Sequence, residues 1–246
     1  MLKTKYAFHA LLCLLKPEIV FDIGSMDGAD SKRFRKLLPK AEIIAFEPNP
    51  NNYRAMCEDH KIEKYGIKVI NKLVSDKAQS RSFFLQNAEV GTDELNRGIS
   101  SALKRRQQGG QHEEIKVDSV RIDSFLNSRE VAKNRVALWI DVEGLAYEVL
   151  EGISDAQDYV HLIHVEVETR EIWTGQRLES DVLRLARSMG YILVAYGSQE
   201  VQRDIILVSQ SWYSANRSLI TGVLRLARYG GPALSKALSI SWAVRA

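Results

Sequence analysis

The sequence feature that most constrains the fold is a strand-like run ending in a glycine turn, residues 20–31. Apolar and β-branched residues open the run, and Gly24 and Gly28 follow before residues typical of a helix start. About twenty residues later, a second apolar run at 43–46 ends on the carboxylate Glu47. A strand, a glycine turn, a helix and a second strand ending in an acid form the nucleotide-binding half of a doubly wound sheet.

Two classes of cofactor use this layout. Enzymes that bind NAD need glycines spaced G-x-G-x-x-G, because the pyrophosphate lies against bare backbone at a helix N-terminus. Here Met26 stands where the middle glycine would be, and Asp27 would repel a pyrophosphate. S-Adenosylmethionine carries an ammonium and no phosphate, which suits Asp22 and the backbone carbonyls of the turn. We therefore predict S-adenosylmethionine, with an NAD-linked oxidoreductase or a glycine turn that binds nothing as alternatives. The predicted cofactor site comprises Asp22, Gly24, Ser25, Gly28 and Glu47.

The N-terminal residues 1–18 resemble a signal peptide, with Lys3 and Lys5 ahead of an apolar run. A strand begins at Ile19, however, so cleavage would cut into the domain. We expect a helix that covers the sheet edge, and a cytoplasmic protein. The whole chain has 246 residues, 45% of them hydrophobic. Residues 19–210 are therefore expected to form one α/β domain. Cys13 and Cys57 lack metal-binding spacing and are expected to be reduced.

Helical and strand-like patterns alternate along most of the chain, which predicts a doubly wound, Rossmann-like α/β fold with a mostly parallel sheet. The last two strands have no helix between them, so we expect an antiparallel strand at the C-terminal edge. Helices are predicted at 30–38, 49–59, 121–127 and 178–189, and further strands at 67–70, 81–85, 115–117, 136–140, 161–168, 191–195 and 205–208.

Carboxylates follow the near-continuous apolar run 136–140, which is typical of a central parallel strand. Ligands of such sheets bind beyond the carboxyl ends of the strands, where Asp141 and Glu143 lie. There a carboxylate can act as a base, position a hydroxyl or bind a metal, or it can merely cap the following helix. Further along, His164 and Glu166 share one face of strand 161–168 and are additional candidates.

Two other segments offer polar contacts to a ligand. Asn71 and Ser75 follow a strand at the position where an adenine ring would lie, or they are ordinary turn formers. The long polar stretch 86–113 contains Ser100, Ser101 and Arg105. These residues are expected to contact an anionic or sugar-bearing acceptor, and a solvated basic loop is the alternative.

The chain resembles the FkbM family of S-adenosylmethionine-dependent methyltransferases. The resemblance rests on four segments of the sequence. They are Phe-Asp-Ile-Gly at 21–24 with Gly28, residues 45–50, residues 120–126, and Ile-Asp-Val-Glu-Gly at 140–144 followed by residues 148–150. It implies a seven-stranded class I methyltransferase sheet and methyl transfer to a hydroxyl of a sugar, glycolipid or natural product. A cofactor-binding protein of this fold without activity is the remaining alternative.

The resemblance also implies roles for individual residues. Asp22, Gly24 and Gly28 would line the methionine and ribose, and Glu47 would hold the ribose. Asp141 and Glu143 would face the sulfonium and the acceptor, and we expect one of them to be the base, with His164 and Glu166 as reserves. No dedicated metal-binding spacing is present. The sequence departs from the family at residues 25–27 and at Trp139, where relatives often have lysine.

The last 36 residues, 211–246, contain five basic residues and no acidic one. They carry a helical apolar stripe that Gly230, Gly231 and Pro232 are expected to interrupt. Such a segment can contact an anionic membrane surface, dock on the domain or pair two subunits. The net charge of the whole chain, +3, is too small to argue for nucleic acid.

Overall fold

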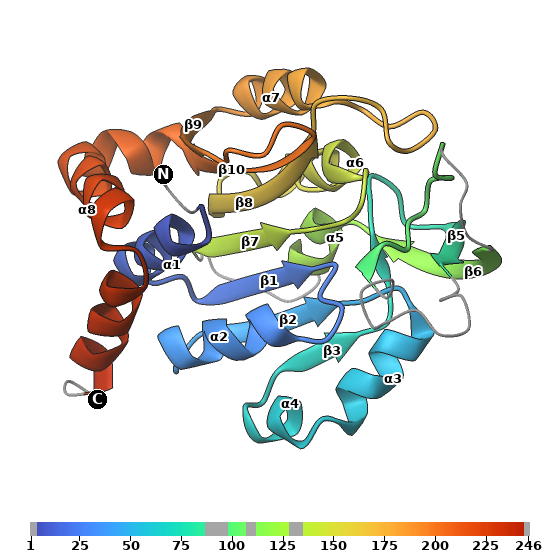
Figure 1. Cartoon of the computed structure of the whole chain (residues 1–246), viewed down its shortest axis with the longest axis horizontal. Coiled ribbons are helices and arrows are strands. Elements are labelled where there is room, and N and C mark those ends of the chain that lie inside the picture. The colour runs from blue at the N-terminus through green and yellow to red at the C-terminus, as the bar shows by residue number, and fades with distance from the viewer. Residues whose placement is uncertain (1–3, 87–97, 107–111, 128–134, 244–246) are drawn as a thin grey trace.

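The computed structural model describes residues 4–86, 98–106, 112–127 and 135–243, with side chains to Arg228. Its centre is a seven-stranded sheet (Figure 1). The strands lie in the order β3 (Lys68–Ile70), β2 (Glu42–Phe46), β1 (Ile19–Ile23), β7 (Val136–Ile140), β8 (Val160–Glu168), β10 (Gln202–Ser209) and β9 (Tyr191–Tyr196).

The sheet has the predicted mixed, mostly parallel topology. β1 pairs in parallel with β2 and with β7, and β7 pairs in parallel with β8. Among the strands of this sheet that the structure describes, only β10 runs opposite to the others, because it pairs antiparallel with both β8 and β9. It is inserted between β8 and β9, so β9 forms the outer strand. Every residue of β1 and of β7 is buried, which explains their continuous apolar character.

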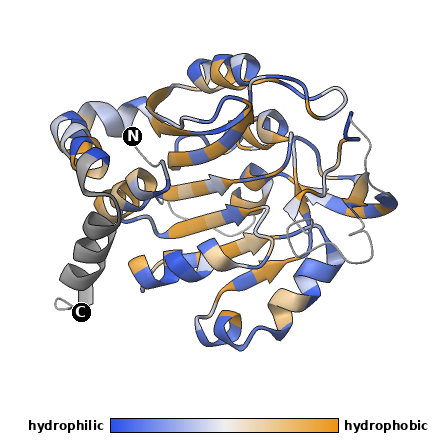
Figure 2. Cartoon of the chain, in the orientation of Figure 1, coloured by the Kyte–Doolittle hydropathy of each residue, from blue (hydrophilic) through white to orange (hydrophobic). Residues whose placement is uncertain are grey.

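Helices cover both faces of the sheet. One face packs against α1 (Thr4–Leu15), α2 (Ala29–Leu37), α3 (Pro50–Glu58), α4 (His60–Lys64) and the first part of α8 (Gln210–Ala243). The other face packs against α5 (Ile122–Asn127), α6 (Ala146–Glu151) and α7 (Glu179–Ser188). Figure 2 shows apolar strands between helices whose outer sides are hydrophilic. No helix in the part of the chain described here is both long and apolar enough to cross a bilayer.

The N-terminal helix α1 lies across a face of the sheet and not along its edge, so that expectation was wrong. It packs on β8 and β10 and against α2 and α8. Phe8, Leu11 and Leu12 are fully buried. Its first turn is fixed by polar contacts, because the Thr4 hydroxyl donates to Asp204 Oδ2 at 2.9 Å. Helix α1 is buried because it has apolar residues on nearly every side, so it must be covered by other elements on most of its surface.

A second sheet of three strands lies beyond the carboxyl ends of the first (Figure 1). It consists of β4 (Leu73–Val74), β6 (His112–Val120) and β5 (Ser80–Gln86), in that order. Leu73, Phe83 and Leu85 form a small core with Leu145, which follows β7. The second sheet therefore forms a wall beside the strand ends where ligands bind in folds of this kind.

The C-terminal helix α8 continues through Gly230, Gly231 and Pro232, where an interruption was expected. Its axis changes direction along its length (Figure 1). The first part belongs to the protein core, since Ile220 and Ala227 are buried in the same cluster as α1.

Candidate functional site

A pocket opens at the carboxyl ends of β1, β2 and β7. Its lining combines the glycine turn after β1, the acid that ends β2, the turn after β7 and apolar residues of the second sheet. The lining includes Gly24, Met26, Glu47, Leu73, Val74, Phe83, Ser100, Asp141 and Glu143.

The glycine turn is in close contact with the end of β7. Gly24 has a φ of +82°, and a Cβ at this position would lie 1.7 Å from the carbonyl oxygen of Asp141. The Gly24 amide donates to the Phe46 carbonyl at 3.0 Å. Only glycine fits here, because any side chain would separate β1 from β7. At Gly28, with φ +69°, a Cβ would lie 2.6 Å from the Ile62 side chain.

Asp22 holds the turn together from beneath. Its Oδ2 accepts hydrogen bonds from the Ser25 hydroxyl at 2.8 Å and from the Ser31 amide and hydroxyl at 2.9 and 2.5 Å. The carboxyl is buried and does not line the pocket. Burial raises the pKa of Asp22 to about 6, against the opposing effect of the hydrogen bonds from Ser31. The structure thus places Asp22 and Ser25 as supports of the turn.

Glu47 lies in the pocket wall opposite Asp141. Its two oxygens accept hydrogen bonds from the amides of Met26 at 2.6 Å and Asn49 at 2.8 Å. Burial raises its pKa to about 7, although these amide donors favour the charged form. Met26 has a left-handed backbone, φ +53°, which is uncommon for a residue with a side chain and often marks a functional site.

The predicted adenine contacts lie behind the pocket lining. The Asn71 amide donates to the carbonyl oxygen of Glu47 at 2.8 Å and so joins the ends of β2 and β3. Ser75 is fully buried and bonds to Asp76 and Arg81. The surface available to an adenine ring is formed instead by the apolar side chains of Leu73, Val74 and Phe83.

Three carboxylates meet where the pocket turns towards β8. One oxygen each of Asp141, Glu143 and Glu166 lies within 4.8 Å of the others. Gln202 on β10 joins two of them, because its amide donates to Glu166 Oε1 at 3.1 Å and to Glu143 Oε2 at 3.4 Å. This carboxylate trio can accept protons, and oxygen ligands of this kind can also bind a hard cation.

Burial and neighbouring negative charges raise the pKa of each member of the carboxylate trio. For Glu143, burial and then the charge of Asp141 raise the pKa to about 8, while Arg105 opposes the shift. Burial and the charge of Asp141 also raise the pKa of Glu166. The side chain of Asp141 is exposed to the pocket. Its pKa is raised as well, first because the surrounding protein reduces its solvation and then because of the charge of Asp204. A carboxylate with such a pKa is a better base near neutral pH than an ordinary one.

The backbone after β7 positions two members of the trio, Asp141 and Glu143. Glu143 adopts a left-handed φ of +47° and Gly144 one of +91°. The Ser101 hydroxyl donates to the Glu143 carbonyl at 2.7 Å, which connects the predicted acceptor segment to this turn. Ser100 lines the pocket itself and accepts a hydrogen bond from the Gln86 amide at 3.2 Å. Arg105 lies outside the pocket lining.

The structure does not bring His164 into the pocket. Its ring is buried beneath α1, stacked on Trp139 and 5.5 Å from the ring of Phe8. Its Nε2 lies 3.7 Å from Asp204 Oδ2. The alternation of β8 places His164 and Glu166 on one side of the strand, but α1 covers only the position of His164.

Sequence reasoning missed Gln202 and Trp173. Gln202 begins an ordinary edge-like strand, and nothing in its neighbours marks it as a partner of the trio. Trp173 packs against Gly144, where a Cβ would lie 2.5 Å from the Trp173 ring. The glycine in the Asp-Val-Glu-Gly motif was the one available signal that a bulky group approaches this turn.

Comparisons with known proteins identify the family to which the chain is similar. Residues 22–193 match the family described as the methyltransferase FkbM domain. The 2-O-methyltransferase NoeI of Sinorhizobium fredii is 26% identical over 79% of this chain and 81% of its own. The hexuronic acid methyltransferase AglP of Haloferax volcanii is 23% identical over 72% and 70%, respectively. Magnesium protoporphyrin IX methyltransferase of Synechocystis PCC 6803 aligns with a TM-score of 0.46 and 13% identity, covering 84% of this chain and 76% of that one.

Proposed function

The chain belongs to the FkbM methyltransferase family and uses S-adenosylmethionine, and on that premise we propose that it methylates a hydroxyl of a sugar or sugar-bearing acceptor. The observation that carries this proposal is the carboxylate trio at the mouth of the pocket, within 4.8 Å of one another. A hydroxyl must lose its proton when it becomes an ether, so a site for O-methylation needs a group that accepts this proton.

The pocket fits the methyl donor. Gly24 lines the pocket with bare backbone beside Asp141, and Glu47 lies where a ribose would present its hydroxyls. Leu73, Val74 and Phe83 offer an apolar surface for the adenine. When bound, S-adenosylmethionine supplies a methyl group that is already activated. The chain must then align the acceptor oxygen with that group and exclude water.

Glu143 and Glu166 are our candidates for the proton acceptor. They share the Gln202 amide, which keeps both carboxyls at the pocket mouth. Their raised pKa values match a base that works near neutral pH. We propose that Asp141, which lies closer to the glycine turn, orients the donor and the acceptor hydroxyl.

The names of two relatives point to the acceptor class. One is a 2-O-methyltransferase and the other acts on a hexuronic acid. The first name specifies methylation at an oxygen, and the second names a sugar acid. A sugar acceptor is therefore the first class to screen.

Calorimetric titration with S-adenosylhomocysteine tests the donor site. We expect micromolar binding by the wild type, weakened at least tenfold in Glu47→Gln and retained in Glu143→Gln, which changes only the acceptor side. Transfer of labelled methyl to a panel of sugars then tests catalysis. A folded protein that does not bind S-adenosylhomocysteine at millimolar concentration would contradict the proposal, and binding without turnover of any sugar would favour a non-catalytic protein.

We also propose that α8 brings the enzyme to an anionic membrane surface. Leu219 and Leu226 expose more than half of their surface, and Arg225 and Arg228 are exposed on the same helix. Apolar side chains with neighbouring arginines are typical of helices that lie in a lipid interface. Vesicles containing anionic lipid should bind the wild type more strongly than Leu219→Ser/Leu226→Ser. Equal binding contradicts the proposal, and a dimer that the same substitutions dissociate would show that the helix pairs subunits instead.

A further inference from the structure

A second depression, of about 650 Å³, lies beside the carboxylate trio. Its lining is basic at one end and reaches the trio at the other, because Gln202 forms part of its wall and also donates to Glu143 and Glu166. The residues around it are Arg105, Arg106, Arg170, Glu171, Ile172 and Gln202. A molecule in this depression therefore lies next to the proposed base.

Two chain segments hold the basic end in place. Arg105 and Trp173 form an antiparallel bridge. On either side of it, the Arg106 amide donates to the Ile172 carbonyl at 2.9 Å, and the Thr174 amide donates to the Lys104 carbonyl at 2.7 Å. The basic segment is therefore attached by backbone hydrogen bonds, unlike a freely solvated loop.

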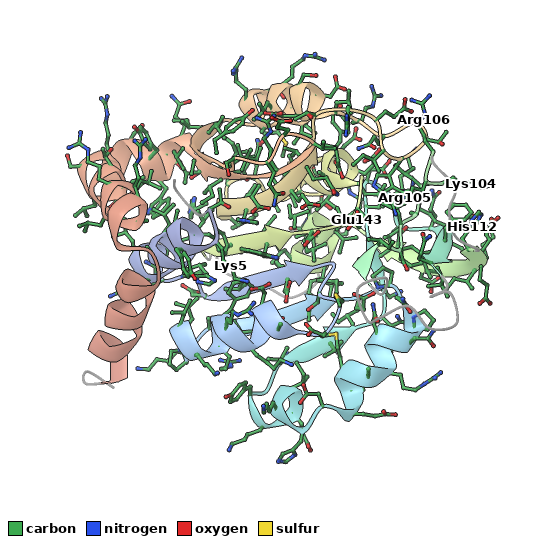
Figure 3. The ribbon with its side chains drawn as sticks, in the orientation of Figure 1. Lys5, Lys104, Arg105, Arg106, His112 and Glu143 are labelled. Atoms are coloured by element: carbon green, nitrogen blue, oxygen red, sulfur yellow. The ribbon has the colours of Figure 1, made fainter. Side chains whose placement is uncertain are left out.

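Trp173 connects this segment to the turn that carries Glu143. Its buried ring packs against Gly144, and the Arg105 guanidinium lies 5.8 Å from the centre of the same ring. Figure 3 shows Arg105 as the labelled basic residue nearest to Glu143. The charge of Arg105 also opposes the burial that raises the pKa of Glu143. The arginine is thus placed by the same tryptophan that supports the carboxylate turn.

The lining of the depression has three arginines and one acid, Glu171. Arg106 pairs with Glu171. Within the described part of the chain, no carboxylate forms an ion pair with Arg105 or with Arg170. Arginine is suited to hold an oxyanion, because its planar guanidinium donates two parallel hydrogen bonds to a carboxylate or phosphate.

We propose that this depression is an anion subsite for the acceptor, in which Arg105 and Arg170 bind a carboxylate or phosphate of the sugar. The inference rests on the proposed function and specifies its substrate class. With the anionic group held there, a hydroxyl of the same molecule extends past Gln202 to Glu143 and Glu166. A neutral sugar lacks the group that these arginines recognise.

The test uses the full chain saturated with S-adenosylhomocysteine. Glucuronate, glucose 1-phosphate and the neutral methyl glucoside are titrated separately by calorimetry at low salt. We expect saturable binding of glucuronate or glucose 1-phosphate and at least tenfold weaker binding of methyl glucoside. Which of the two anions binds more tightly distinguishes a sugar acid from a sugar phosphate. Arg105→Ala/Arg170→Ala should weaken the binding of the anion at least tenfold.

The control is Arg187→Ala, which removes an exposed arginine of α7 that has no ion pair among the described residues. It should bind the anion as the wild type does. Equal anion binding by the wild type and the double variant, or no binding of either anion to the loaded protein, would overturn the inference. Titration of S-adenosylhomocysteine itself separates the two proposals, because loss of donor binding contradicts the proposed function, whereas donor binding without anion binding contradicts only the subsite.

Discussion

The ring of His164 stacks on the ring of Trp139, with centroids 3.6 Å apart and planes inclined by 4°. Both rings belong to neighbouring parallel strands, where Trp139 and His164 are register partners. Phe8 of α1 meets each ring edge-on, at 5.4 and 5.5 Å. This arrangement joins the N-terminal helix to the two strands that carry the carboxylate trio, and it favours a packing role for the histidine.

Replacement of His164 tests that role. We expect His164→Ala to lower the free energy of unfolding by about 3 kcal/mol, as for other large aromatic side chains removed from a core. His164→Phe should retain most of the stability, because the ring stack remains and the 3.7 Å from His164 Nε2 to Asp204 Oδ2 is longer than a hydrogen bond. Urea unfolding measures both. A His164→Phe enzyme that is fully stable but loses turnover would show that the imidazole acts in catalysis.

Replacement of Gly24 by alanine should be far more damaging than replacement of Gly66, although both glycines have a positive φ. Gly24→Ala places a Cβ 1.7 Å from the Asp141 carbonyl, so β1 and β7 must separate and donor binding should be lost. Gly66→Ala is the matched control, because Gly66 also has a positive φ, +59°, but open space around it. It should cost only about 1–2 kcal/mol. Thermal unfolding and titration with S-adenosylhomocysteine distinguish the two, and equal effects would refute the close approach.

Turnover should rise with pH. The pKa of Glu143 is raised to about 8, so at lower pH the carboxyl is mostly protonated and cannot take the acceptor proton. We expect the rate to increase about tenfold per pH unit below that value and then to level off. Glu143→Gln or Glu166→Gln should lower kcat by about 10²–10⁴-fold for the residue that is the base. Glu113→Gln, at an exposed position of β6, should change nothing. A rate that is flat between pH 6 and 9 would exclude both glutamates.

Asp22 should make stability depend on pH. Burial raises its pKa in the folded protein from the ordinary 3.8 to about 6, so the folded state holds the proton more tightly. The stabilising contribution is complete below about pH 4 and is lost as the pH rises through 6. The free energy of unfolding of the wild type, relative to Asp22→Asn, should therefore fall by about 3 kcal/mol over this window. Urea unfolding at several pH values measures the difference. A constant difference would mean that Asp22 is charged throughout.

The parts of the fold that sequence predicts are those governed by local pattern. The apolar run before Asp141 and the glycines after β1 indicate strand ends that meet at one edge, and the structure confirms the parallel sheet. Of the two candidates that share one face of strand 161–168, Glu166 does lie with Asp141 and Glu143, as expected of a carboxylate that needs a partner on a buried strand.

What sequence could not predict depends on contacts between distant segments. The short strand β4 joins the second sheet where Leu73 pairs with Ser119, and neither residue carries a signal for the other. The burial of His164 depends on where α1 lies, and a helix that is apolar on nearly every side does not reveal which surface it covers. The basic depression likewise exists only because residues near Arg105 pair with residues near Trp173.

The placement of α1 has a consequence for how the chain folds during synthesis. The Thr4 hydroxyl and its acceptor Asp204 are 200 positions apart, so α1 leaves the ribosome long before β10, against which it packs. During that interval Phe8, Leu11 and Leu12 have no permanent partner. The nascent chain thus exposes an apolar helix until β10 has been made, and that helix is an expected binding segment for chaperones that protect unfinished proteins.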